Sequence, residues 1–187
     1  MNAQRLLDLA FASAGVALFA APVAAIAVAI VAEDGGPVLF RQVRVGRDRR
    51  SFTIHKLRTM RDGRVTRVGR WLRATGLDET AQFIDVLRGD MRMVGPRPLT
   101  PDDVRRFGYD GPEHDVRFSV PPGITGLAQV MGGRTIRASR RYDGLYLRAT
   151  SARLDVELIG ASFAMNLVGK QRARTLLRRV RRATRAS

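Results

Sequence analysis

The stretch from Ala10 to Ala32, AFASAGVALFAAPVAAIAVAIVA, contains no charged residue. As an α-helix it would be roughly 35 Å long at about 1.5 Å per residue, which is comparable to the hydrocarbon core of a bilayer. A secretory signal peptide is one alternative, but its apolar region is usually only about 7–15 residues long and follows a basic segment. Here Arg5 is the one base before the stretch, and Asp8 offsets its charge. The stretch therefore predicts a helix embedded in a membrane.

Pro22 lies close to the midpoint of this apolar stretch. Proline cannot donate a hydrogen bond to the carbonyl of Leu18, and its ring crowds the preceding turn, so the helix should kink there. A bilayer tolerates such a kink, because local adjustments satisfy the freed carbonyl. Two topologies remain open. The helix either spans the membrane with a bend, with the Arg-rich remainder in the cytoplasm, or dips in and returns to the same face.

The composition limits the classes of partner and of site that the chain can have. Its 187 residues suffice for one domain with a core, and its formal net charge is +16. Such a balance indicates a polyanionic partner, which means nucleic acid, an anionic membrane surface or phosphorylated substrates. The chain contains no cysteine, so disulfides, thiolate zinc sites and cysteine nucleophiles are excluded. Aromatic residues make up only 6% of the chain and provide few stacking platforms for single-stranded nucleic acid.

Beyond the apolar stretch, the pattern predicts a turn at 33–37, strands at 38–46 and 51–57 that form a hairpin, a basic amphipathic helix at 65–75 and a helix at 152–168. The basic helix suits a membrane surface or phosphate groups, and a solvated helix on a globule is the alternative. The tail at 170–187 has eight basic residues and no acidic one, which favours contact with anionic lipids.

Two adjacent carboxylates, Asp78 and Glu79, precede a run of helix formers that ends at Gly89. Asp is a preferred N-cap residue and Glu suits the positive end of a helix dipole, so local rules favour an ordinary helix cap over a chemical role. Further along, Arg97 lies between two prolines in MVGPRPLTP. A pre-organised arginine loses little entropy when it binds a phosphate, and a structural turn is the alternative.

Four phrases occur in a fixed order along the chain: GPVLFRQVRVG, HKLRTM, GLDETAQFIDVLRGDMRMVGPRP and PPGITGLAQV. Together they closely resemble the bacterial sugar transferase family, the monotopic phosphoglycosyl transferases, from the apolar stretch to about Ser162. At 187 residues the chain resembles the minimal form of that family. The resemblance implies one compact, mostly helical α+β unit with a small β element near residues 38–57. It also implies amphipathic surface helices and a re-entrant N-terminal helix, broken at the position of Pro22.

The resemblance also implies an activity. Members of this family transfer a sugar-1-phosphate from a UDP-sugar to polyprenol phosphate and release UMP. They act through an aspartyl-phosphosugar intermediate with Mg²⁺, at the first membrane step of glycoconjugate or exopolysaccharide assembly. The expected location is the cytoplasmic face of the bacterial inner membrane. Anionic lipids are the further expected partner and nucleic acid is not expected; the oligomeric state, a dimer included, is left open.

The resemblance assigns roles to individual positions. Asp78 matches the nucleophile and a ligand of Mg²⁺, and Glu79 matches the second member of the catalytic dyad. Glu79 could orient Asp78 or the metal, or accept a proton; these roles stay open. The positions expected to bind phosphates or the sugar nucleotide are Lys56, Arg58, Arg73, Arg97, Gln129 and Arg134.

Three segments are expected: a membrane anchor at 1–36, a catalytic domain at 37–169 and a basic tail at 170–187. The main rival interpretation is a membrane-tethered basic module that binds nucleic acid or anionic lipid. It explains the charge and the anchor but leaves the ordered motifs without a role. A second rival, a scaffold that has lost catalysis, conflicts with the intact pair Asp78 and Glu79.

Overall fold

A computed structural model describes residues 2–133 and 135–168. Its helices are α1 (Ala3–Asp34), α2 (Arg67–Thr75), α3 (Gln82–Arg88), α4 (Pro101–Arg106), α5 (Asp115–Phe118), α6 (Leu127–Met131), α7 (Ile136–Ala149) and α8 (Ala152–Val168). Its strands are β1 (Leu39–Val45), β2 (Ser51–Leu57), β3 (Met60–Arg61), β4 (Arg64–Val65), β5 (Arg92–Val94) and β6 (Gly123–Thr125). Short 3-10 turns form η1 (Arg47–Arg49), η2 (Leu77–Glu79) and η3 (Pro112–His114). The predicted α+β, mostly helical class is confirmed.

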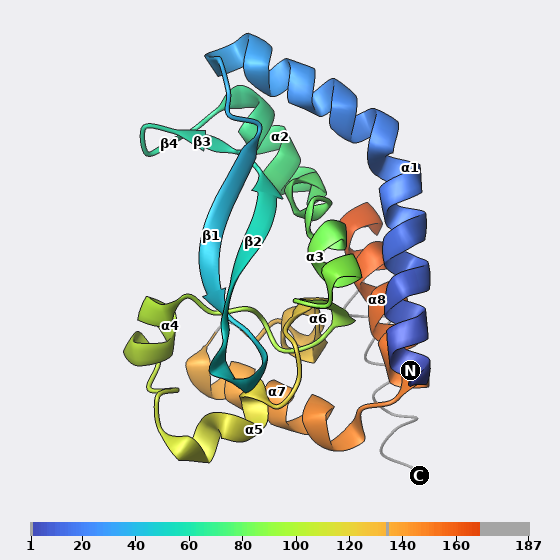
Figure 1. Cartoon of the computed structure of the whole chain (residues 1–187), viewed down its shortest axis with the longest axis vertical. Helices are drawn as coiled ribbons and strands as arrows, with labels where there is room; N and C mark the ends of the chain where they lie inside the picture. Colours follow the sequence, from blue (N-terminus) through green and yellow to red (C-terminus); the bar gives the residue numbers. More distant parts are fainter. Residues whose placement is uncertain (1, 134, 169–187) are drawn as a thin grey trace.

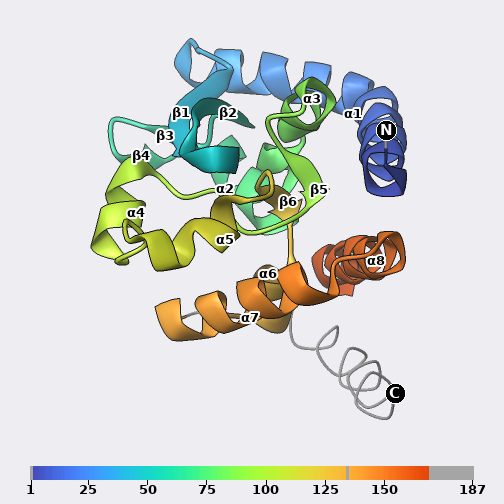
Figure 2. The same cartoon turned by 60° about the horizontal axis from the view of Figure 1, so that its bottom comes forward.

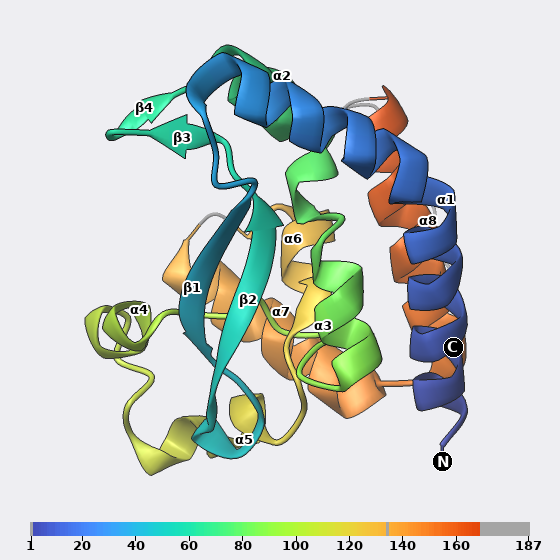
Figure 3. The same ribbon diagram turned by 45° about the horizontal axis from the view of Figure 1, so that its top comes forward.

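The helix α1 contains the predicted apolar stretch and bends near the middle of its length (Figures 1 and 3). In Figure 2 its first half is seen nearly end-on, whereas its second half runs across the top of the molecule. Pro22 lies inside the helix, as the predicted kink requires. The Asn2 side chain caps the first turn, and Gly35, at φ 79°, ends the helix.

Among the described residues, α1 is the one helix long and apolar enough to cross a membrane. Only 17% of its most apolar window is buried against the rest of the molecule. The core helix of a soluble protein would be mostly buried. The outward surface of α1, in contrast, is an apolar face that the described residues leave uncovered. The side chains of Leu18 and Val28, on either side of Pro22, are mostly exposed. This surface agrees with the predicted membrane contact.

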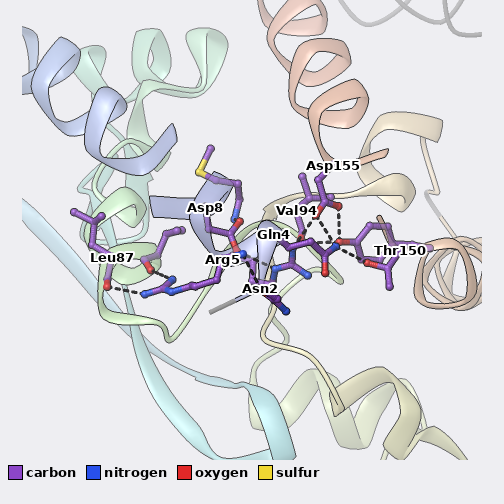
Figure 4. Close-up of polar contacts among 12 residues, drawn as sticks. Asn2, Gln4, Arg5, Asp8, Leu87, Val94, Thr150 and Asp155 are labelled. Carbon is purple, nitrogen blue, oxygen red and sulfur yellow. Dashed lines mark hydrogen bonds and ion pairs between the residues drawn. The ribbon is translucent and has the colours of Figure 1, made fainter. Parts of the chain in front are cut away.

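A polar network fastens the first turns of α1 to the rest of the molecule (Figure 4). Asp8 accepts hydrogen bonds from Arg92 Nε at 3.0 Å and from the backbone N–H of Met93 at 2.9 Å. Arg5 donates to the carbonyls of Val86 and Leu87 at the end of α3, at 2.7 and 2.9 Å. These contacts bring the start of α1 beside β5 and α3.

Arg92 continues this network toward the C-terminal helices. Its Nη2 donates to Asp155 Oδ2 at 2.7 Å, and Gln4 Nε2 donates to the same oxygen at 2.9 Å. Tyr146, buried on α7, places its hydroxyl 2.8 Å from Asp155 Oδ1. The same network therefore joins α1, β5, α7 and α8.

The last turn of α1 contacts the rest of the molecule through a different set of polar groups. Glu33 accepts hydrogen bonds from the backbone N–H groups of Arg67 and Val68, at 2.7 and 3.0 Å, and so caps α2. These bonds lower the pKa of Glu33. Asp34 forms an ion pair with Arg58, directly after β2. Both ends of α1 are thus held by polar contacts to one body.

The predicted hairpin is confirmed: β1 and β2 pair antiparallel, with Leu39 opposite Leu57 and Val45 opposite Ser51. Successive side chains on a strand point to opposite faces. His55 therefore faces away from its neighbour Lys56, and its Nδ1 lies 2.7 Å from Asp85 Oδ1 on α3. This contact sets α3 against one face of the hairpin.

Two segments rich in proline and glycine also form short strands, which the sequence analysis did not predict. β5 and β6 pair in parallel, with Arg92 opposite Gly123 and Val94 opposite Thr125. A Cβ atom at Gly123 would lie 2.0 Å from the backbone nitrogen of Gly95, so the close approach requires glycine. Through this pairing, the GPRP loop lies beside the PGITG segment.

The helices predicted at 65–75 and 152–168 are present as α2 and α8. In α2, Val68 and Leu72 pack against Ile26 and Ile30 of α1, which agrees with the predicted apolar face. The helix α7 was not predicted, because its arginines and Gly144 obscure the apolar periodicity. The basic tail at 170–187 lies outside the described residues.

Candidate active site

A cavity of about 580 Å³ lies between the hairpin, the turn η2 and the C-terminal helices. The predicted site residues that line it are Lys56, Arg73, Asp78, Glu79, Arg97 and Gln129. They come from β2, α2, η2, the GPRP loop and α6. Residues more than 70 positions apart in the sequence therefore meet around one space.

Two predicted phosphate-binding positions do not join this group. Arg58 is absent from the cavity lining, because its guanidinium is paired with Asp34 at the end of α1. Its role in this arrangement is to join the hairpin to the anchor helix. Arg134 lies outside the described residues.

The geometry of Asp78 contradicts the helix-cap interpretation. Asp78 lies in the middle of η2, which starts after Gly76 at φ 76°, a conformation that favours glycine. The N-cap residue of α3 is Ala81, and no side chain caps that helix. The carboxylate of Asp78 is therefore not used for a structural cap, and it lines the cavity instead.

The surroundings of Asp78 disfavour its negative charge. Burial raises the pKa of Asp78, and the charge of Glu79 raises it further, while Lys56 and Arg73 act in the opposite direction. A desolvated carboxylate is more basic than one in water, and additional positive charge beside it would stabilise its ionised form. This is a favourable setting for a nucleophile.

Glu79 has a defined partner in the structure. Its Oε1 accepts a hydrogen bond from Lys56 Nζ at 2.7 Å, and both side chains are partly exposed at the cavity. Because η2 places Asp78 and Glu79 next to each other, this ion pair keeps the Lys56 ammonium close to Asp78. The observed contact thus pairs Glu79 with Lys56 at the cavity.

Arg73 and Arg97 are held by contacts that leave them at the cavity wall. Arg73, in the last turn of α2, donates from Nε to the Thr59 hydroxyl at 2.9 Å. The carbonyl of Arg97 accepts a hydrogen bond from Arg117 Nη2 at 2.7 Å, and buried Arg117 is paired with Asp143 on α7. Of the two alternatives for Arg97, the cavity-lining position is present, and Arg97 itself lies in an irregular segment after the bend at Gly95 and Pro96.

Arg44 is a site residue that the sequence analysis missed. It lines the cavity, and its Nη1 donates to the carbonyl of Pro98 at 2.9 Å. Burial lowers the pKa of Arg44, and the nearby charge of Arg97 lowers it further. The alternation of Arg44 with Val43 and Val45 would place the valines inside and the arginine outside, so the local pattern pointed away from Arg44. The hairpin register supplies the signal instead, because Arg44 pairs with Phe52 and so shares the face of Lys56.

The charge of the cavity wall favours an anion. Among residues 2–133 and 135–168, the charged lining residues are four cations, Arg44, Lys56, Arg73 and Arg97, and two carboxylates, Asp78 and Glu79, which leaves an excess of two positive charges (4 − 2). Guanidinium and ammonium groups form strong charge-assisted hydrogen bonds to phosphate oxygens. The cavity is thus suited to a phosphorylated ligand beside a basic carboxylate.

Comparison with known proteins identifies the family. The model of the family described as bacterial sugar transferase matches residues 1–169. A UDP-glucose:undecaprenyl-phosphate glucose-1-phosphate transferase of Caulobacter vibrioides is 45% identical over 145 residues, which cover 70% of this chain and 54% of that protein. A UDP-N-acetylgalactosamine-undecaprenyl-phosphate N-acetylgalactosaminephosphotransferase of Aeromonas hydrophila is 37% identical over 185 residues, covering 89% of this chain and 44% of the relative.

A further UDP-glucose:undecaprenyl-phosphate glucose-1-phosphate transferase, from Klebsiella pneumoniae, is 36% identical over 188 residues, which cover 89% of this chain and 40% of that protein. The chain thus spans about half the length of these relatives, or less. The family model covers nearly the whole chain, from the anchor helix through α8. The chain belongs to the bacterial sugar transferase family.

Proposed function

We propose that this protein is a phosphoglycosyl transferase that moves a sugar-1-phosphate from a UDP-sugar to polyprenol phosphate and releases UMP. The names of the relatives support this substrate class. The observation that carries the proposal is the carboxylate of Asp78, which caps no helix, is partly removed from water and lies in a cavity whose described lining includes four cations. In the pathway, the reaction is the first membrane step of glycoconjugate or exopolysaccharide assembly.

In the first step, a carboxylate oxygen of Asp78 attacks the phosphorus that carries the sugar. The new O–P bond forms as the bond from that phosphorus to the bridging oxygen breaks, and UMP leaves with the bridging oxygen and its electron pair. Attack by a carboxylate on a diphosphate brings negative charges together. Arg73, Arg97 and Lys56 reduce this repulsion, because their charges lie on the wall around Asp78.

In the second step, an oxygen of polyprenol phosphate attacks the phosphorus of the aspartyl-phosphosugar. The bond to Asp78 breaks, the carboxylate is restored, and polyprenol diphosphate-sugar is the product. The same cations serve both steps, since each step moves negative charge through the same phosphoryl group. Glu79 contributes by positioning Lys56, whose Nζ lies 2.7 Å from Glu79 Oε1.

The donor set of the cavity fits Mg²⁺ as a cofactor. This ion is usually held by one or two carboxylates together with substrate phosphates, rather than by a cage of protein ligands. The described lining residues include two carboxylates, Asp78 and Glu79, and the described chain has no cluster of three His, Cys, Asp or Glu side chains. Asp78 would hold the ion, because Glu79 is already paired with Lys56. When bound, Mg²⁺ neutralises charge on the diphosphate.

A re-entrant topology of α1 is part of the proposal. A helix that crossed the bilayer would have its ends on opposite faces, about 30 Å apart. The first turns of α1 instead contact Arg92 and Met93, while Glu33 at its last turn caps α2 of the same body. One body cannot lie on both faces of a membrane. The kinked helix therefore dips in and returns, with the basic body on the cytoplasmic face of the inner membrane.

The topology can be tested without background labelling, because the chain has no cysteine. Ala3→Cys and the reference variant Arg64→Cys place one thiol at each of two exposed positions. In intact spheroplasts, a membrane-impermeant maleimide is expected to label neither thiol, and to label both after permeabilisation. Labelling of Ala3→Cys alone in intact spheroplasts would show that α1 spans the membrane.

The activity is tested with membrane fractions that contain the protein, radiolabelled UDP-sugars, polyprenol phosphate and Mg²⁺. We expect release of UMP and transfer of the label to the lipid phase for at least one sugar. The rival, a membrane-tethered basic module, predicts binding to nucleic acid or anionic vesicles with no UMP from any sugar. A panel that includes glucose, galactose and their N-acetylated forms also identifies the sugar.

A further inference from the structure

Two side chains of the cavity wall that are more than nine-tenths buried, Gln82 and Thr125, each have a polar atom without a hydrogen-bond partner in the described part of the chain; Oε1 of the less buried Gln129 is a further such atom. Gln82 is 2% exposed and Thr125 is 7% exposed, and both line the cavity. Neither Gln82 Nε2 nor Thr125 Oγ1 has a partner among residues 2–133 and 135–168. Buried polar groups in folded proteins are nearly always hydrogen-bonded, so each exception requires an explanation. A ligand in the adjacent cavity would supply the missing partners.

The main chain at both positions is fixed independently of any ligand. Gln82 is the first residue of α3, one helical turn before the buried Val86. Thr125 ends β6, and its carbonyl accepts a hydrogen bond from the backbone N–H of Gly95 at 2.9 Å. The β5–β6 pairing therefore fixes the main chain of Thr125 and leaves its hydroxyl unused. A main chain that is fixed before binding lowers the entropic cost of binding a ligand.

The chemistry of the pair differs from that of the cationic wall. The Gln82 amide and the Thr125 hydroxyl carry no charge. In contrast, Arg44 and Lys56 on the hairpin and Arg73 on α2 provide positive charges that can bind phosphates. The amide nitrogen donates, and the hydroxyl both donates and accepts. These properties match ligand hydroxyl groups, which also donate and accept. The cavity thus combines a charged wall with an uncharged hydrogen-bonding one.

The position of Gln82 relative to Asp78 indicates which part of the substrate Gln82 would contact. Gln82 follows Asp78 by four residues, about one helical turn, and both line the same cavity. In the proposed reaction the nucleotide leaves after the first step, and the phosphosugar stays on Asp78. A side chain one turn from Asp78 is close to the group that Asp78 retains.

We propose that the Gln82 amide and the Thr125 hydroxyl form a neutral subsite that binds hydroxyl groups of the sugar on the phosphosugar moiety. This inference rests on the proposed transferase function and adds to it the residues that recognise the sugar. A site that hydrogen-bonds a substrate hydroxyl rejects an analogue that lacks it, because the buried site groups are then left unpaired. Gln82 and Thr125 therefore contribute to the choice of sugar.

The test uses Gln82→Met and Thr125→Val, which remove the polar groups and nearly keep the volume. For the accepted UDP-sugar, kcat/KM is expected to fall about 10–100-fold in each variant. The Kd of UMP, measured by calorimetry, should stay within about twofold of the wild type. The Tm should be unchanged or higher, since an unpaired buried group is removed. Thr53→Val, at an exposed position on β2, is the matched control and should behave like the wild type.

A series of UDP-deoxysugars makes the assignment specific. The wild type should discriminate against one deoxy position, and Gln82→Met or Thr125→Val should lose that discrimination, as a double-mutant cycle requires. Equal losses of UMP affinity and kcat/KM would overturn the proposal, because the pair would then bind the nucleotide. Unchanged discrimination at every deoxy position would overturn it as well. A wild type that releases UMP from no UDP-sugar would instead refute the transferase function itself.

Discussion

Asp78→Asn is expected to abolish UMP release from a UDP-sugar, with the rate falling by at least about 10³-fold. The amide cannot form the acyl phosphate, although it fills nearly the same space in the cavity. The measurement combines UMP release with retention of a ³²P label from the sugar-bearing phosphate on acid-quenched protein. The wild type should retain the label, and Asp78→Asn should not.

Asp62→Asn is the matched control for this substitution. Its side chain is 92% exposed in the β3–β4 turn, and at φ 48° asparagine is well tolerated. The control should keep wild-type activity and labelling. UMP release that persists in Asp78→Asn would show that another group is the nucleophile.

The variant Asp78→Asn should also be more stable than the wild type at neutral pH. Because burial raises the pKa of Asp78 above its ordinary value of 3.8, the folded state binds the proton more tightly than the unfolded state does. The stability of the wild type therefore decreases as the pH rises from 3.8 through the folded pKa, and asparagine has no such loss. We expect a higher Tm for Asp78→Asn at pH 7, and a difference that shrinks toward pH 4. A lower Tm at pH 7 would indicate that the carboxylate has a structural role.

Arg92→Ala is expected to lower the free energy of unfolding by about 3–5 kcal/mol. The Arg92 side chain is 11% exposed and forms ion pairs with two carboxylates, Asp8 and Asp155, that are each 4% exposed. Its removal leaves two buried negative charges without a counterion. Denaturant unfolding in detergent micelles measures the loss, and proteolysis near Gln4 should increase because α1 loses its attachment.

Two further variants separate this mechanism from a general effect of losing arginine. Arg153 is 90% exposed and pairs with Glu157 on α8, so Arg153→Ala should cost less than about 1 kcal/mol. The triple variant Asp8→Asn, Arg92→Met and Asp155→Asn replaces the charges with neutral groups and should recover most of the loss. A triple variant as unstable as Arg92→Ala would mean that packing, and not the unpaired charge, causes the loss.

Much of the fold follows from local patterns. The uncharged run and Pro22 predict a long kinked membrane helix, and the residues around β1 and β2 predict the hairpin, because amphipathic periodicity and backbone sterics act over a few neighbouring residues. The strands β5 and β6 were missed for the same reason. Each is three residues long, and only their pairing across Gly95 and Gly123 makes them strands.

The sequence by itself determined the family, the anchor helix and the position of Asp78 and Glu79 within an ordered motif. Only the tertiary structure decided that Asp78 does not cap a helix and that Arg58 is paired with Asp34 instead of lining the cavity. It also added Arg44, Gln82 and Thr125 to the cavity, and it joined both ends of α1 to one body. The physical reason is that burial, ion pairing and unpaired polar groups depend on contacts between residues distant in the chain. Local sequence patterns do not predict those contacts.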